Sequence, residues 1–125
     1  MAKTIIHTAA APPPFAGYSQ AVAAQGLIFV SGQGPFTADG TLAGETIEEQ
    51  TAQCLRNIQT ILRAAGSGLD KAVSATFILA EEADFAGMNA VWQQWFPTDP
   101  PARQGARLPV RPKGMKVSIA LIAEA

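Results

Sequence analysis

The stretch TIEEQTAQCLRNIQTILRAAG, residues 46–66, decides the fold because it carries the signals of one long helix. Thr46, with Glu49 three residues later, forms a capping box, in which two backbone donors at the helix start gain side-chain partners. Apolar residues then recur at helical spacing: Leu55, Ile58, Leu62 and Ala65, flanked by Cys54 and Ile61. Gly66 is a natural C-terminal stop. We therefore expect a helix whose apolar stripe packs against another layer.

Strand signals lie on both sides of this helix. Residues 18–32 read as two strands joined at Gln25-Gly26, and the run LIFVS is apolar enough to be buried. Residues 32–44 form a loop or hairpin, because glycines and Asp39-Gly40 punctuate them. Further strands are expected at residues 3–7, 71–80, 102–108 and 115–123.

A second helix begins near Asp84 and ends at Pro97. Its apolar residues fall on one face: Phe85, Met88, Trp92 and Trp95. The order of elements predicts a single domain over residues 1–125, an α+β or α/β sandwich with two helices on one face of a sheet of about six strands. No third helix is available for the other face, so we expect a partner subunit to cover it.

Composition supports an oligomer and excludes several classes of protein. Apolar residues make up 48% of the 125 residues and charged residues 15%, an excess of apolar surface for one small domain. No apolar run is long enough to span a membrane, and the N-terminal segment lacks a signal-peptide pattern. With Cys54 as the single cysteine, no internal disulfide forms, and we expect a cytoplasmic protein.

Neither a metal nor a cofactor is expected. His7 and Cys54 are the only histidine and cysteine, which excludes the usual His/Cys metal sites, and the acidic residues are scattered. The pair Gly32-x-Gly34 lacks the third glycine of a dinucleotide motif and precedes a turn rather than a helix. Cys54 falls on the apolar side of a helix, which favours a core position.

Positive charge gathers in PARQGARLPVRPKGMK, residues 101–116. This segment holds five of the nine basic residues, Arg103, Arg107, Arg111, Lys113 and Lys116, and none of the acidic ones. It fits a solvated strand end with a turn, a nucleic-acid surface or a site for a small carboxylate. The net charge of −1 and the lack of interleaved aromatic residues argue against a general nucleic-acid surface. The residues alone do not choose among the three.

A resemblance to a known family narrows these alternatives. The segments GYSQA (17–21), LIFVSGQGP (27–35), DFAGMNAVWQQWF (84–96), PPAR (100–103) and KGMKVSIALIA (113–123) occur in the family's order. Together they resemble the RidA/YjgF family of reactive-intermediate deaminases, many of which are labelled endoribonuclease L-PSP. The resemblance implies a chorismate-mutase-like α+β sandwich that assembles as a homotrimer, with a central barrel and three clefts between subunits.

The resemblance also implies a chemistry, the hydrolysis of enamines and imines such as 2-aminoacrylate to a 2-oxoacid and ammonia. By position, Arg103 matches the arginine that clamps the substrate carboxylate. The matching cleft positions are Tyr18, Ser31, Gly32 and Asn89, with backbone groups near Gly32 and Gly105 placing substrate and water. The expected partners are therefore a small carboxylate substrate and two further copies of the chain; nucleic acid is not expected.

This chain departs from the family pattern at the catalytic positions. Gly105 stands where many members carry a cysteine, and Ser118 stands where the last strand usually carries the glutamate that activates water. A serine hydroxyl is no general base near neutral pH without an activator. Glu124 is six residues further along, about 20 Å at strand rise, too far to substitute within one chain.

Three functions follow from this pattern, in decreasing order of support. The first is a deaminase with weakened catalysis, in which Arg103 anchors the substrate and Ser118 or backbone groups hold the water. The second is a non-catalytic binder of small carboxylates or 2-oxoacids on the same scaffold. The third is an RNA-directed role of the kind that the endoribonuclease label suggests.

Overall fold

The computed structural model describes residues 2–108 and 112–125. The strands are β1 (Thr4–Ile6), β2 (Ala21–Ala24), β3 (Leu27–Gln33), β4 (Ala72–Leu79), β5 (Ala102–Arg107) and β6 (Val117–Glu124). The helices are α1 (Ile47–Ala64) and α2 (Phe85–Trp95), with short 3-10 turns at η1 (Leu69–Lys71), η2 (Glu82–Asp84) and η3 (Pro112–Gly114). Every predicted helix and strand is present, and most boundaries lie within two residues of those expected.

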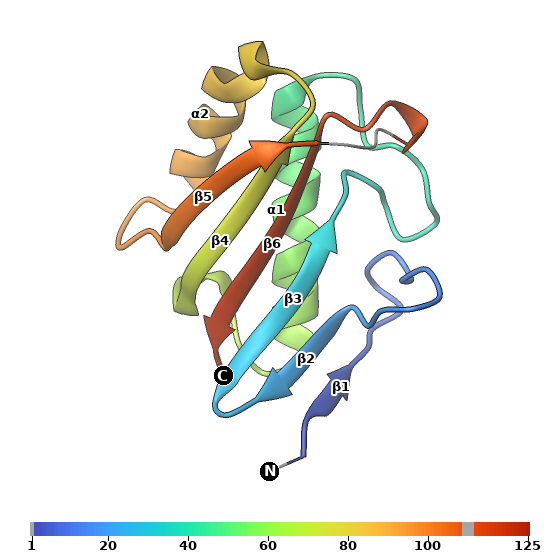
Figure 1. Ribbon diagram of the computed structural model, residues 1–125, viewed down its shortest axis with the longest axis vertical. Helices are drawn as coiled ribbons and strands as arrows, with labels where there is room; N and C mark the ends of the chain where they lie inside the picture. Colours follow the sequence, from blue (N-terminus) through green and yellow to red (C-terminus); the bar gives the residue numbers. More distant parts are fainter. Residues whose placement is uncertain (1, 109–111) are drawn as a thin grey trace.

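All six strands form one mixed sheet in the order β1-β2-β3-β6-β4-β5. Every neighbouring pair is antiparallel except β4 and β5, which run parallel and are joined through α2. Both helices lie behind the same face of the sheet (Figure 1). The predicted α+β sandwich is therefore confirmed, and the far face of the sheet is left open.

The local signals at both ends of α1 act as the sequence predicts. Thr46 Oγ1 accepts from the Glu49 N–H at 3.1 Å, while Glu49 Oε1 accepts from the Thr46 N–H at 3.3 Å. At the other end Gly66 has φ +81°, and the Ser67 N–H donates to the Leu62 carbonyl at 2.8 Å. These bonds satisfy backbone groups that a helix end leaves without partners.

The β2–β3 hairpin turns at Gln25-Gly26, where the sequence places it. Gln25 has φ +53° and Gly26 has φ +76°, the pair of positive angles that a tight two-residue hairpin turn requires. The turn sets the register Ala24↔Leu27 and Ala21↔Val30. In that register Ile28 and Val30 face the helices and are buried, while Phe29 faces the other way.

The core lies between the helices and the inner side of the sheet. α1 contributes residues that are fully buried: Cys54, Leu55, Ile58, Ile61 and Leu62. They pack with β6 side chains of the inner face, Val117, Ile119 and Leu121. Burial raises the pKa of the Cys54 thiol, because a thiolate would lose its hydration there, so this cysteine is a core residue.

The apolar stripe of α2 is buried only in part. Met88 and Trp92 lie in the core as the pattern predicts, and Trp95 is half-buried. Phe85, the first residue of the helix, is 40% exposed. It lies beside Phe77 of β4, with 5.8 Å between ring centroids, close to the sheet edge formed by β5. The β5 side chains are exposed throughout.

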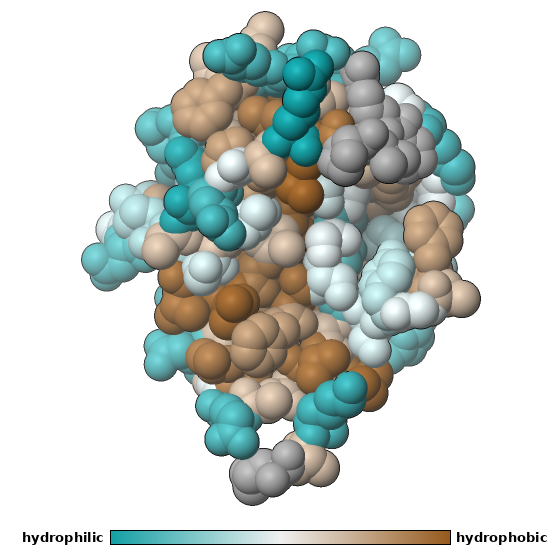
Figure 2. All heavy atoms as spheres, viewed as in Figure 1, coloured by the Kyte–Doolittle hydropathy of each residue, from teal (hydrophilic) through white to brown (hydrophobic). Residues whose placement is uncertain are grey.

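The open face of the sheet is largely apolar. The registers align Ile5, Val22, Phe29 and Ile122 in one row across β1, β2, β3 and β6. Ile5 is 54% exposed and Phe29 is 41% exposed. Figure 2 shows this face, with hydrophobic side chains spread over the strands. Nothing in the described part of the chain covers it.

Within the described residues, no helix is long and apolar enough to cross a membrane.

Candidate functional site

One pocket, of about 280 Å³, lies where three loops meet the ends of β3 and β6; we call it the loop pocket. It is lined by Pro12, Pro13, Pro14, Phe15, Tyr18, Gly32, Gln33, Gly34, Phe36, Gly40, Lys113, Met115 and Ser118. The walls are mostly proline, aromatic and glycine residues, while Tyr18, Gln33, Lys113 and Ser118 bring polar groups. Tyr18, Gly32 and Ser118 were all predicted from the sequence, and the structure brings them together here.

Two buried amides of α1 hold the loops that form this pocket. Asn57 Nδ2 donates to the carbonyls of Gly34 at 3.2 Å and Phe36 at 2.8 Å. Gln50 Nε2 donates to the Gly44 carbonyl at 3.1 Å, and Gln50 Oε1 accepts from the Lys116 N–H at 2.8 Å. The loop after β3 and the loop before β6 are therefore both tied to the same helix.

A third buried amide, Gln20, fixes the proline segment on the other side of the pocket. Gln20 Oε1 accepts from the Thr8 N–H at 2.8 Å. Gln20 Nε2 donates to the carbonyls of Thr8 at 3.0 Å and Pro12 at 2.9 Å. A proline-rich segment has few backbone donors of its own, so its carbonyls need donors from elsewhere in the fold.

Ser31 positions the pocket rather than opening into it. Its hydroxyl donates to the Ser19 carbonyl at 2.5 Å, and its backbone N–H donates to the Gln20 carbonyl at 2.9 Å. These bonds fix the segment that carries Tyr18, whose side chain is 47% exposed. The sequence prediction placed Ser31 in the cleft; the structure assigns its hydroxyl to the backbone behind Tyr18.

Gly32 and Ser118 are immediate neighbours on the open face. The ladder between β3 and β6 is irregular between Val30 and Gln33, which brings Gly32 beside β6. A Cβ atom at Gly32 would lie 3.1 Å from Ser118 Oγ. The glycine therefore leaves the serine hydroxyl accessible from the pocket. The Ser118 hydroxyl makes no hydrogen bond to another described residue.

Arg103 lies in a second cluster, at the β5 edge of the sheet. Its Nη1 donates to Asn89 Oδ1 at 2.7 Å. Its guanidinium carbon lies 5.2 Å from the ring centroid of Phe77, 5.6 Å from that of Phe85 and 5.1 Å from that of Trp92. We call this set the arginine cage. Arg103 is exposed, so donors of its guanidinium remain open to a ligand.

Gly105 belongs to the same edge and is matched to Phe77. The two residues pair across β4 and β5, and a Cβ atom at Gly105 would fall 2.2 Å from Phe77 Cζ. No side chain fits there unless the ring moves. Gly105 also lines a broad groove of about 980 Å³, which we call the β5 groove. Its walls are Phe77, Leu79, Ala80, Glu81, Glu82, Ala83, Phe85, Ala86, Gly105, Ala106 and Arg107.

A single chain does not bring these two clusters together. Ser118 alternates with the buried Val117 and Ile119 and so faces the open side of the sheet. Arg103 and Gly105 pair with residues of the helix side. β4 and β6 also lie between β5 and β3. The predicted residues therefore form two partial sites on opposite faces of the sheet.

Two further basic residues of the segment divide between these places. Arg107 lines the β5 groove with Glu81 and Glu82, and Lys113 Nζ lies 6.0 Å from the ring centroid of Phe36 at the loop pocket. Arg111, which the sequence analysis could not assign, lies outside the described residues. The basic segment is therefore split between two sites and is not one continuous patch over the described residues.

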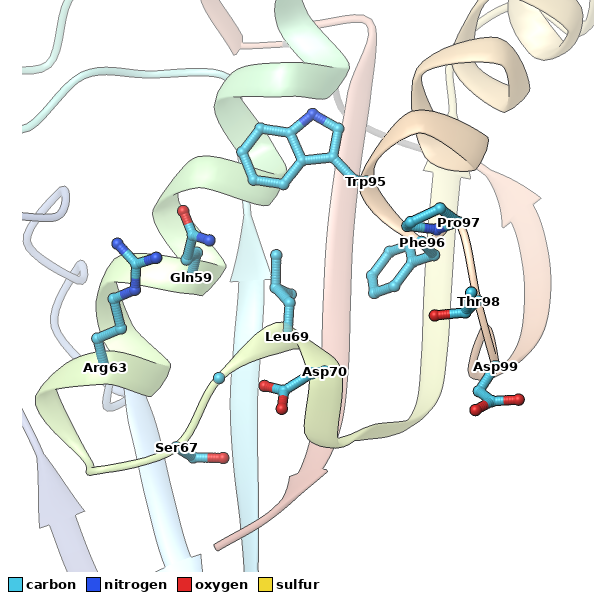
Figure 3. A pocket seen from close by; sticks show the side chains of 11 residues that line it. Gln59, Arg63, Ser67, Leu69, Asp70, Trp95, Phe96, Pro97, Thr98 and Asp99 are labelled. Carbon is cyan, nitrogen blue, oxygen red and sulfur yellow. The ribbon is translucent and has the colours of Figure 1, made fainter.

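A third hollow, of about 440 Å³, lies between the C-terminal ends of the two helices (Figure 3). It is lined by residues of both helix ends and η1, including Gln59, Arg63, Asp70, Trp95 and Asp99. No sequence-predicted site residue lies there. Among the described residues, no group of three or more His, Cys, Asp and Glu side chains is placed to hold a metal ion.

Sequence reasoning missed the buried amides and Phe77. Gln50 and Asn57 interrupt the inner side of α1, and polar residues on a buried stripe are the signal that could have found them. Phe77 carried no such signal. Its contact with Gly105 depends on the β4–β5 register, which only the folded chain defines.

Comparison with known proteins covers nearly the whole chain. Residues 8–125 match the family model described as Endoribonuclease L-PSP. The RutC family protein y4sK of Sinorhizobium fredii is 44% identical over 115 residues, which is 91% of each chain. The 2-iminobutanoate/2-iminopropanoate deaminase of Capra hircus is 40% identical over 124 residues, 98% of this chain and 90% of that one. The crystal structure of yeast Mmf1 matches with a TM-score of 0.93 at 34% identity, over 98% of both chains.

Replacing Asn57 by leucine should loosen the loop pocket. The substitution leaves the carbonyls of Gly34 and Phe36 buried without their donor, so the free energy of unfolding should fall by about 1–3 kcal/mol. Urea unfolding at neutral pH measures this loss. Gln59→Leu is the matched control, on the same helix at a side chain without a hydrogen bond in the described structure. Equal losses in the two variants would contradict the role given to Asn57.

Proposed function

This chain belongs to the endoribonuclease L-PSP family, which is the RidA/YjgF family that its sequence resembles. On that premise we propose that it hydrolyses small carboxylate-bearing enamines and imines to 2-oxoacids and ammonia. The observation that carries the proposal is the arginine cage, an exposed guanidinium that a neighbouring amide and three aromatic rings hold in place. The deaminase names of relatives support the same chemistry.

Arg103 acts as the carboxylate anchor. A guanidinium presents its donors in a fixed fork that matches the two oxygens of a carboxylate. Asn89 occupies one nitrogen and thereby fixes the orientation of the fork, so the remaining donors stay available. The aromatic rings replace some of the water around the cation, which strengthens its attraction for an anion. Asn89 is therefore a positioning residue.

The complete site forms between copies of the chain. The loop pocket and the arginine cage lie on opposite faces of one sheet, so a substrate held by Arg103 in one copy meets Tyr18, Gly32 and Ser118 of another. The apolar row Ile5, Val22, Phe29 and Ile122 gives such an assembly a surface to bury. A trimer joins the two partial sites at each of its three boundaries through one repeated contact.

The reaction requires one water and two proton transfers. Water adds to the imine carbon and forms a carbinolamine; the nitrogen then gains a proton and leaves as ammonia, while the carbinol oxygen loses its proton and becomes the 2-oxoacid carbonyl. The Ser118 hydroxyl, beside Gly32, holds the attacking water by a hydrogen bond. It takes no proton at neutral pH, so the proton passes to solvent. We therefore propose catalysis slower by about 10²–10⁴-fold than with a carboxylate base.

The second candidate is a binder of small carboxylates or 2-oxoacids that does not hydrolyse them. One observation favours it: within the described residues, no acidic side chain lines the loop pocket beside Ser118. The arginine cage serves binding and hydrolysis equally well, so binding alone does not separate the two. An RNA-directed role has the least support, because Arg107 shares its groove with Glu81 and Glu82.

Ammonia release from freshly generated imines tests the enzyme. Arg103→Ala should lower kcat/KM by about a hundredfold, since it removes the anchor of a charged group. Ser118→Glu should raise kcat by about a hundredfold by adding the missing base. Arg63→Ala, an exposed arginine on α1, is the control and should leave both constants unchanged. Activity that survives Arg103→Ala intact would reject the assigned anchor.

No activity in the wild type, together with activity in Ser118→Glu, would establish the binder instead. Calorimetry would then still identify Arg103 as the carboxylate anchor if Arg103→Ala lost its affinity for 2-oxoacids. Unchanged binding would remove Arg103 from both candidate functions.

Sedimentation equilibrium tests the assembly. The wild type should give the mass of three chains. Phe29→Glu places a charge in the middle of the apolar row and should give monomers, because burying an unpaired charge costs several kcal/mol. Ala90→Glu adds the same charge to the exposed side of α2 and should leave the trimer intact. A stable wild-type monomer would contradict the site between subunits.

A further inference from the structure

The structure also points to the size and character of the substrate side chain. We propose that the β5 groove binds an aromatic or bulky apolar side chain, so that this chain prefers such 2-imino acids over the smallest ones. This inference rests on the proposed function, since it takes Arg103 as the carboxylate anchor. It goes beyond that function by naming Phe77, Phe85 and Gly105 as residues that determine specificity.

The pairing of Gly105 with Phe77 shapes the floor of the groove. The ring of Phe77 ends where the side chain of residue 105 would begin, with 2.2 Å between Cζ and a Cβ built at Gly105. The two positions face each other across the parallel ladder of β4 and β5. The Phe77 ring thus occupies the space that a side chain at Gly105 would take, and it forms the surface next to Arg103.

The groove and the anchor share two walls. Phe77 and Phe85 line the groove and also lie 5.2 Å and 5.6 Å from the Arg103 guanidinium carbon. A molecule whose carboxylate meets Arg103 therefore has its substituent beside these rings. The substituent gains contact in proportion to the apolar area that it covers. Phe85, which is 40% exposed, gains cover from the same contact.

The charges in the groove favour a substrate with one carboxylate. Apart from Glu81, Glu82 and Arg107, every residue of its wall is apolar or glycine. Glu82 offsets the positive charge of Arg107, so the groove offers no excess positive charge to a second substrate carboxylate. An apolar ring meets no such penalty along the alanine, leucine and phenylalanine surface. The groove therefore selects a monocarboxylate with an apolar side chain.

Binding of two 2-oxoacids tests the inference without depending on turnover. Calorimetry with the full-length protein should show that phenylpyruvate binds about tenfold or more tightly than pyruvate, because its ring covers the groove. Phe85→Ala should reduce that ratio to a few-fold, because it removes a wall of the groove. Pyruvate affinity should fall less than phenylpyruvate affinity, and equally for both acids only if Phe85 acts through the arginine cage alone. Phe85 is exposed, so this variant is expected to fold.

Gly105→Ala supplies a matched variant on the floor of the groove. The added methyl group displaces the Phe77 ring into the groove, so the preference for phenylpyruvate should fall. Combining it with Phe77→Ala removes the clash, so the double variant should bind both acids as Phe77→Ala does. This non-additivity separates a packed pair from two independent effects. Thermal unfolding of each variant accompanies the titrations.

The outcomes separate this inference from the proposed function. Equal affinities for pyruvate and phenylpyruvate in the wild type would overturn the inference, as would a preference that survives both Phe85→Ala and Gly105→Ala. Tighter binding of phenylpyruvate than of pyruvate, without ammonia release from the imines of these two acids, would support the inference and reject hydrolysis. If neither acid binds at millimolar concentration, Arg103 is not a carboxylate anchor, and both the inference and the proposed site are rejected.

Discussion

The walls of the loop pocket depend on three buried side-chain amides, those of Gln20, Gln50 and Asn57. Each supplies hydrogen bonds to stretches of chain that have no ladder or helix to satisfy their carbonyl groups. An unpaired buried carbonyl costs about as much as a lost hydrogen bond, so these loops are ordered only while the amides stay in place. Two of the three amides lie on α1, the helix whose apolar stripe forms the core. Core packing and two of the pocket's loops therefore depend on one element, while Gln20 holds the proline segment.

The sheet then constrains what one chain can do with that pocket. Side chains alternate between the two faces of a strand, so Ser118 must face away from the core that Val117 and Ile119 enter. Arg103 lies on the opposite face of the sheet, among aromatic rings that include Trp92 of α2. No rotation of side chains brings the two together through a sheet. The proposed chemistry therefore requires assembly, and the exposed apolar row on the open face provides a surface for it.

The sequence predicted the helix ends and turns that short-range signals determine. It did not predict the contacts that depend on how distant strands pair. The capping box at Thr46, the stop at Gly66 and the turn at Gln25-Gly26 are short-range features, and all three occur as predicted. Arg103, Gly32 and Ser118 were named through the family resemblance, but their division between two faces follows only from the strand pairing. The contact of Phe77 with Gly105 joins residues 28 positions apart in sequence, and no local pattern announces it.

Mixing of two inactive variants tests the central claim, a site shared between copies, most directly. Arg103→Ala destroys the anchor, and Gly32→Val fills the space beside Ser118, so neither variant alone should release ammonia from an imine. Refolded together in equal amounts, they should form mixed trimers if the proposed assembly is right, and one boundary of each would join an intact arginine cage to an intact loop pocket. The mixture should recover about a quarter of wild-type activity. Mixed trimers without any recovered activity would contradict a site built from two chains.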